Sequence, residues 1–186
     1  MQADEPSDGA ARIAGTALVE VTLDLAGAYL DMVDEFEAAG EGYPFNDAEL
    51  ARRDFAAFVD DLRNEALGVG LPSGVVPQTT YLLLDRKGRA LGEIRLRPHL
   101  TPPFERHHGH IGYNVRPRQR GKGYATRMLA LTLNKARALG LERVMLPVEG
   151  ENPASVHVIE KNGGVLERRI TDKTSGEPVA LYWIAL

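Results

Sequence analysis

The sequence predicts a single α+β (mixed α/β) domain of three layers, in which a central, mostly antiparallel sheet is flanked by helices. Three observations support this fold class. The length of 186 residues suits one domain. Segments with alternating apolar residues, typical of strands, are separated by longer segments with helical apolar spacing. Three expected strands follow one another without an intervening helix, which favours antiparallel pairing.

The expected order is strand, two helices, three strands, helix, strand, helix and two strands. We expect strands over Ala17–Leu25, Thr79–Leu84, Ala90–Arg97, His110–Val115, Arg143–Val148, Val165–Thr171 and Val179–Leu186. We expect helices over Leu25–Ala39, from Asn46 to about Leu67, over Tyr124–Leu139 and from Asn152 to Gly163. Residues 1–15 are small and polar, so we expect a flexible tail there and a single domain over residues 16–186.

Residues that favour helix starts support three of these boundaries. Asp24 is expected to cap the first helix. Asn46, followed three residues later by Glu49, is a capping-box pattern and predicts the start of the second helix. Asn152 and Pro153 together form an N-cap followed by a proline in the first turn.

The composition excludes several classes of protein. The chain has no cysteine, which rules out disulfides, zinc–thiolate sites, iron–sulfur clusters and a thiol nucleophile. A net charge of -4 is not typical of a nucleic-acid-binding protein. The longest apolar run, Val179–Leu186, is far shorter than the roughly 18 residues of a membrane helix. No secretory signal is evident either, so we expect a cytoplasmic protein that binds neither nucleic acids nor membranes.

The segment over residues 118–125 is the strongest candidate for a binding site. Gly121 and Gly123 permit a tight turn and the close approach of a ligand. The segment leads into a predicted helix, whose first N–H groups lack backbone partners and form an anion site. Three cations lie in it: Arg118, Arg120 and Lys122. Together these features predict a site for a phosphate or pyrophosphate.

Two phosphate-binding loops do not fit this segment. A Walker loop needs a glycine five residues before Gly121, where this chain has Arg116, and a serine or threonine where it has Gly123. A dinucleotide-binding fingerprint needs a third glycine where the chain has Thr126, and it belongs near the start of a βαβ array. A third pattern, Arg-x-x-Gly-x-Gly, fits from Arg118 onwards.

That third pattern resembles the pyrophosphate loop with which the GNAT superfamily of N-acyltransferases binds acyl-coenzyme A. Residues from about position 78 to the C-terminus look like a GNAT domain, and the expected element order fits the GNAT fold. The segments that carry the resemblance are Ile111–Pro117, the loop and its helix, Asn152–Ser155 and Glu160–Gly164. Tyr182–Ile184 is similar to a bacterial branch of predicted acetyltransferases.

The resemblance implies acetyl-CoA as the acyl donor and places it between two diverging strands, those that end at Val115 and at Val148. Its pantetheine arm would pair with the backbone near Tyr113 and Val115. The residues implied to bind coenzyme A are Val115, Arg118, Arg120, Gly121, Lys122, Gly123, Tyr124, Ala125, Asn152 and Ser155. From the residues alone, Asn152 is as well explained as a plain N-cap without a binding role. The alternative interpretation of Lys122 is a solvated lysine at the start of a helix.

An amine acceptor must lose a proton before it attacks the thioester, and His110 and Glu93 are the candidates for the general base. His110 precedes the loop on a predicted strand, where alternation would place it on one face with Gly112 and Asn114. Many GNAT enzymes carry a tyrosine acid seven residues after the asparagine, but this chain has Ile159 there. Tyr113 or water is the alternative acid.

The acceptor itself is not identified by the sequence. The resemblance suggests that the segment Gly40–Asn46, with Glu41, Tyr43 and Phe45, forms one wall of its pocket. We expect a small amine or a protein or peptide amine as partner, and a monomer or homodimer. The histidines near His110 predict no metal site, because neighbouring strand residues point to opposite faces. A non-catalytic acyl-CoA-binding or sensor protein on the same fold is the alternative function.

Overall fold

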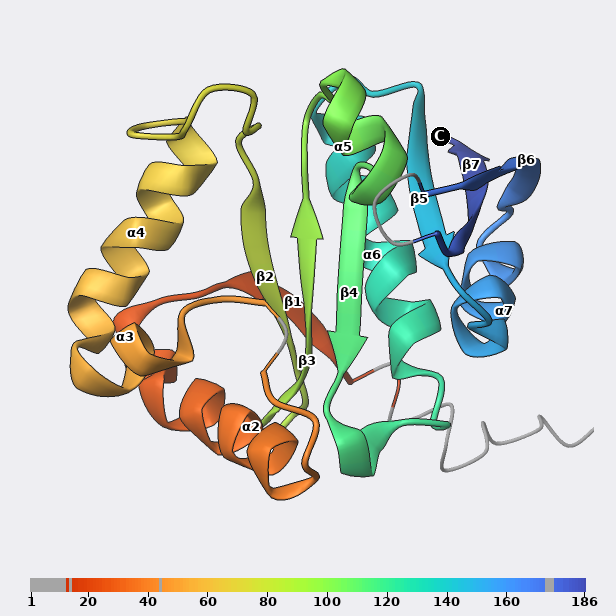
Figure 1. Cartoon of the computed structure of the whole chain (residues 1–186). Coiled ribbons are helices and arrows are strands. Elements are labelled where there is room, and N and C mark those ends of the chain that lie inside the picture. Colours follow the sequence, from red (N-terminus) through yellow and green to blue (C-terminus); the bar gives the residue numbers. More distant parts are fainter. Residues whose placement is uncertain (1–12, 14, 44, 173–175) are drawn as a thin grey trace, which may run out of the picture.

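The computed structural model describes residues 13, 15–43, 45–172 and 176–186. The tail expected over residues 1–15 therefore lies outside the described residues, apart from positions 13 and 15. Within the described part, the chain forms two antiparallel sheets with helices packed on them (Figure 1). The mixed α/β class with antiparallel strands flanked by helices is confirmed.

The first sheet contains four strands in sequence order: β1 (Ala17–Glu20), β2 (Thr79–Leu84), β3 (Ala90–Leu96) and β4 (Ile111–Val115). The second sheet contains three, in the order β5 (Arg143–Glu149), β7 (Pro178–Ala185) and β6 (Val165–Thr171). All strand pairs are antiparallel. Since β4 and β5 share no ladder, the expected central sheet is divided between them.

Helices cover both faces of the first sheet. One face carries α2 (Ala26–Ala38), α3 (Ala48–Arg53) and α4 (Phe55–Leu67), and the opposite face carries α6 (Tyr124–Ala138). Two further helices, α5 (Pro102–His107) and α7 (Pro153–Lys161), contact β5. Two short 3-10 turns complete this part of the fold: η1 (Leu23–Leu25) precedes α2, and η2 (Pro117–Gln119) precedes the loop that leads into α6. Among the described helices, none is both long and apolar enough to cross a membrane.

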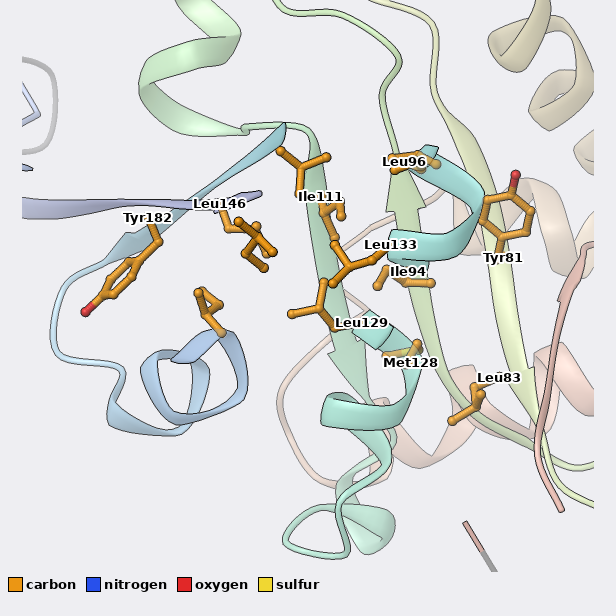
Figure 2. Close-up of a cluster of buried hydrophobic side chains, with 14 of the residues drawn as sticks. Tyr81, Leu83, Ile94, Leu96, Ile111, Met128, Leu129, Leu133, Leu146 and Tyr182 are labelled. Carbon is orange, nitrogen blue, oxygen red and sulfur yellow. The ribbon is translucent and has the colours of Figure 1, made fainter. Parts of the chain in front are cut away.

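One hydrophobic core joins the two sheets through α6 (Figure 2). Leu129 and Leu133 of α6 share a buried cluster with Ile111 of the first sheet and with Leu146 and Tyr182 of the second. Each such side chain, when fully buried, contributes about 1.5–3 kcal/mol. Packing on α6 therefore holds the sheets together although β4 and β5 do not pair.

The register of β3 on β4 decides which residues share a face. Glu93 lies directly opposite Asn114, and Arg95 lies opposite Gly112. Paired residues in an antiparallel sheet point to the same side, so these four positions share the face that α2 covers. The neighbouring pair, Ile94 and Tyr113, points to the α6 face.

Several helix boundaries differ from the expectation. The strand predicted over Ala17–Leu25 ends at Glu20, and Asp24 accepts a hydrogen bond from Thr22 (2.6 Å) instead of capping α2. The single helix predicted from Asn46 is two helices that meet at Asp54, where φ is -152°. Asp47, and not Asn46, caps α3. The proline-containing loop after β3 also includes a helix that was not predicted, α5.

We predict that Asp54→Ala destabilises the protein by about 0.5–2 kcal/mol, because the Asp54 carboxylate caps α4 by accepting a hydrogen bond from the Ala57 N–H (3.0 Å). Chemical denaturation measures the change in the free energy of unfolding. Asp61→Ala, on the exposed side of α4, is the control and should change it little. Equal effects of the two variants would contradict the capping role.

Candidate functional site

A cleft of about 580 Å³ lies between the end of β4, the start of α6 and α7. The strands β4 and β5 meet only near the start of β4, where the His110 N–H donates to the Met145 carbonyl (2.8 Å). Farther along, the cleft is lined by the end of β4, the loop before α6, the first turn of α6 and one side of α7. A volume of this size is ordinary for a small-molecule site.

The edge of β4 presents backbone groups to this cleft. The Arg116 N–H, just after β4, donates to the Leu91 carbonyl of β3 (3.0 Å). Peptide groups alternate in direction along a strand, so those of Tyr113 and Val115 point away from β3 and towards the cleft. An extended ligand that carries amide groups can therefore pair with this edge as an additional strand would.

The loop between η2 and α6 forms the end of the cleft. Gly121 and Gly123 have φ values of 73° and 83°, a left-handed conformation that favours glycine. The Arg127 N–H donates to the Gly123 carbonyl (3.1 Å), so the preceding N–H groups of the first turn have no intrahelical acceptor. Tyr124 and Ala125 also line the cleft. This end of the cleft therefore has the geometry of an anion site.

The three cations of the loop have different environments. The Arg120 guanidinium lines the cleft and donates to both carboxylate oxygens of Glu41 (2.7 and 2.6 Å) and, through Nε, to the Val115 carbonyl (3.1 Å). The hydrogen bonds from Arg120 lower the pKa of Glu41. The Lys122 ammonium donates to the Arg118 carbonyl (2.7 Å), and neither of these two residues is part of the described cleft lining. Of these three loop cations, Arg120 alone belongs to the described cleft lining.

The start of α7 forms the opposite wall. The Asn152 side chain accepts a hydrogen bond from the Ser155 N–H (3.0 Å), so it caps α7, and both residues line the cleft. The two interpretations of Asn152 left open by the sequence are therefore compatible. Lys161 and His157 also line the cleft, although we did not predict them. They follow Ala154, another lining residue, by seven and three positions respectively, so helical spacing from Ala154 was the available signal.

Tyr113 lines the cleft and carries a hydroxyl, whereas Ile159, at the position of the tyrosine in many related enzymes, has no proton to donate. The Tyr113 hydroxyl donates to the Ser155 carbonyl across the cleft (3.4 Å), and burial raises the pKa of Tyr113. Ile159 is 1% exposed and belongs to the main core. The helix face that carries a tyrosine in many related enzymes is therefore used here for packing.

Glu93 is a fully buried carboxylate on the α2 face of the first sheet. Tyr43 donates to its Oε2 atom, and Asn46 Nδ2 donates to its Oε1 atom (2.9 Å). Arg95 Nε lies 3.4 Å from Oε1. Burial is the main reason that the pKa of Glu93 is raised, while Arg95 and the hydrogen bonds oppose the rise. A buried carboxylate of raised pKa is suited to accept a proton.

His110 does not share the setting of Glu93. β4 begins at Ile111, although the Arg97 N–H still donates to the His110 carbonyl (2.8 Å), and the His110 ring lies near Trp183 with centroids 6.0 Å apart. Its Nδ1 atom accepts a hydrogen bond from the Met145 N–H (3.0 Å). Burial, together with the nearby charges of Arg97 and Arg143, lowers the pKa of His110 to about 4. Of the two base candidates, the geometry favours Glu93.

The segment between α2 and α3 contributes more than the sequence indicated. Glu41 binds Arg120, Tyr43 binds Glu93, and the ring of Phe45 lies under the Arg95 guanidinium (4.1 Å from centroid). Asn46, expected to cap a helix, bonds to Glu93 and Arg95 instead. Among the described residues, no group of three or more acidic or histidine side chains has the geometry of a metal site.

The comparisons with known proteins agree with this geometry. A family model described as an acetyltransferase (GNAT) domain matches residues 18–165. A search of curated proteins finds no match. The chain therefore belongs to the GNAT family of N-acetyltransferases, and its class of activity is acetyl transfer.

Solved structures of low sequence identity share the fold. Ribosomal-protein-S5-alanine acetyltransferase from Vibrio fischeri has a TM-score of 0.68 at 15% identity, over 92% of this chain and 93% of that chain. RimL, a ribosomal L7/L12 alpha-N-protein acetyltransferase in complex with coenzyme A, has a TM-score of 0.66 at 17% identity, over 92% and 94%. Spermidine/spermine N-acetyltransferase SpeG from Vibrio cholerae has a TM-score of 0.61 at 15% identity, over 93% and 94%.

We predict that Gly121→Glu abolishes coenzyme A binding, because the new carboxylate would repel phosphate in the loop. Isothermal titration calorimetry with coenzyme A measures the affinity. Gly140→Glu is the matched control: Gly140 also has a left-handed φ, 81°, and open space around it, but it follows the far end of α6. Both variants should carry the same backbone strain, so retained affinity in Gly121→Glu would move the phosphate site elsewhere.

Proposed function

We propose that this protein transfers an acetyl group from acetyl-CoA directly to a primary amine, with Glu93 as the general base. The observation that carries the proposal is the position of Glu93 directly opposite Asn114, a residue of the cleft wall. A proton acceptor therefore lies one strand away from the cleft in which the thioester would be held.

The cleft residues suit the parts of acetyl-CoA. The loop glycines and the first N–H groups of α6 fit the pyrophosphate, and Arg120 adds a guanidinium. The cleft-facing N–H and carbonyl of Tyr113 fit the amides of the pantetheine arm, while the Val115 carbonyl already accepts from Arg120. Asn152 and Ser155 form the facing wall. Arg118 and Lys122 support the loop in this proposal, since the Lys122 ammonium closes it onto the Arg118 carbonyl.

In this proposal, Glu93 and Tyr113 carry out the two proton transfers of the reaction. Glu93 removes a proton from the acceptor amine, the amine nitrogen bonds to the carbonyl carbon, and the carbon–sulfur bond breaks. In this proposal the Val115 N–H, on the cleft edge of β4, donates to the carbonyl oxygen of the thioester. Tyr113 supplies a proton to the departing thiolate. The chain has no cysteine to carry the acetyl group, so both substrates must be bound together.

The fold neighbours act on different amines. By their printed names, one acetylates an alanine of ribosomal protein S5 and another acetylates spermidine or spermine. Both small and protein amines therefore remain within the proposal, as do a monomer and a homodimer. The cytoplasm remains the predicted compartment, because a chain without cysteine has no disulfides to form.

We expect Glu93→Gln to lower kcat by about 10²–10⁴-fold while the affinity for acetyl-CoA stays unchanged, because the amide keeps the shape of the side chain but accepts no proton. Release of coenzyme A thiol against a panel of primary amines measures turnover. Glu142→Gln, at an exposed glutamate, is the control and should retain full activity. Tight acetyl-CoA binding without thiol release for any amine, even in the wild-type protein, would instead support a non-catalytic sensor.

The pH dependence gives a separate test of Glu93. Burial raises the pKa of Glu93, and a protonated carboxyl cannot accept a proton, so kcat/KM should fall as the pH drops through this raised pKa. Activity is retained above that pKa, where the carboxylate is ionised. The acceptor amine also titrates, so the profile should be measured with two amines of different pKa. An acidic limb that moves entirely with the amine would contradict the role of Glu93.

A further inference from the structure

Gly112 leaves an open space beside the proposed base. It lies opposite Arg95 on the face that carries Glu93, and a Cβ atom added there would meet nothing within 4 Å. Its φ is not in the left-handed region, so the backbone does not require glycine. Glu93 is fully buried, and this open space lies on the same face of the sheet.

Asn114, two residues after Gly112 on β4, has a buried carboxamide without hydrogen-bond partners in the described part of the chain. It lines the cleft and lies directly opposite Glu93. Within the described part of the chain, its Nδ2 and Oδ1 atoms are both buried and both lack a hydrogen-bond partner. Buried polar atoms normally find partners, and an unpaired one costs about 1–3 kcal/mol. A ligand that both donates and accepts hydrogen bonds would remove this cost.

The charges around this space do not suit a polycation. Arg95 lies directly opposite Gly112 and already pairs with Glu93. The five carboxylates of α2 and the turn after it are also paired with arginines. Arg52 binds Asp34 and Glu37, Arg116 binds Asp31 and Glu35, and Arg120 binds Glu41. Among the described carboxylates of α2 and the turn after it, a polyamine would therefore find none that lacks an arginine partner for its additional ammonium groups.

We propose that the acceptor reaches Glu93 over Gly112, is oriented by the Asn114 carboxamide, and is an amine with a carbonyl group on the adjacent carbon. In this arrangement the Asn114 Oδ1 atom accepts from the amine and its Nδ2 atom donates to the carbonyl. Such α-amino acyl groups occur in amino-acid amides and at peptide N-termini. The inference rests on the proposed function and adds the route and the chemical class of the acceptor.

The route is tested by filling the space. Gly112→Val should lower kcat/KM for the acceptor by about tenfold or more, while the dissociation constant of acetyl-CoA changes less than about twofold. Gly27→Val is the matched control, because Gly27 also has open space and an ordinary φ but lies on the exposed side of α2. Thermal unfolding checks that both variants fold. Unchanged acceptor kinetics in a folded Gly112→Val protein would overturn the route.

The acceptor class is tested with Asn114→Ala and three probes: alaninamide, a tripeptide with N-terminal alanine, and isopropylamine, which lacks the carbonyl. Each variant is compared with the wild type on the same probe, which removes differences in amine pKa. We expect about a tenfold or larger loss for the two carbonyl-containing probes and a clearly smaller loss for isopropylamine, which loses only the contact of its amine with Oδ1. The ratio of tripeptide to alaninamide turnover distinguishes a peptide N-terminus from a free amide.

The outcomes separate this inference from the proposed function. Equal losses for all three probes would overturn the acceptor class and leave acetyl transfer standing. The same holds if the wild type acetylates spermidine faster than the three probes and Asn114→Ala leaves that rate unchanged. Absence of thiol release with every amine in the wild type would overturn the proposed function itself.

Discussion

The candidate site depends on the fact that β4 pairs on one side only. Its β3 side is a regular antiparallel ladder, and its other side meets β5 only around His110 and Met145. If the two strands had paired along their length, the peptide groups of Tyr113 and Val115 would be satisfied and no cleft would exist. The shared core on α6 stabilises the separated strands, because packing of both sheets on this helix replaces the missing hydrogen bonds between β4 and β5.

Polar contacts link the loop to the buried carboxylate. Glu35 of α2 accepts from the Arg118 N–H (2.8 Å) and pairs with Arg116, which docks α2 onto the start of the loop. The turn that follows α2 then binds Arg120 through Glu41 and Glu93 through Tyr43. One helix and its following turn therefore position both the anion site and the proposed base. The Arg116–Glu35 pair is partly buried, with side chains 12% and 9% exposed, so loss of either partner would leave a poorly solvated charge.

The accuracy of the sequence predictions followed the range of the interactions involved. The glycine–arginine loop and the cap of α7 depend on neighbouring residues, and the structure places both at the cleft. Asn46 was misassigned, because its partner is Glu93, which lies far away in the chain, while the adjacent Asp47 caps the helix. The break at Asp54 was missed because the apolar spacing continues across it.

From the sequence by itself came the fold class, the order of the strands and main helices, the glycine loop, and the exclusion of thiol chemistry. These follow from local conformational preferences, periodicity and composition, which each segment carries with it. Only the tertiary structure decided that β4 and β5 diverge, that Glu93 is buried beside Tyr43, and that the space over Gly112 is open. Burial and long-range pairing depend on residues distant in the chain, so no single segment encodes them.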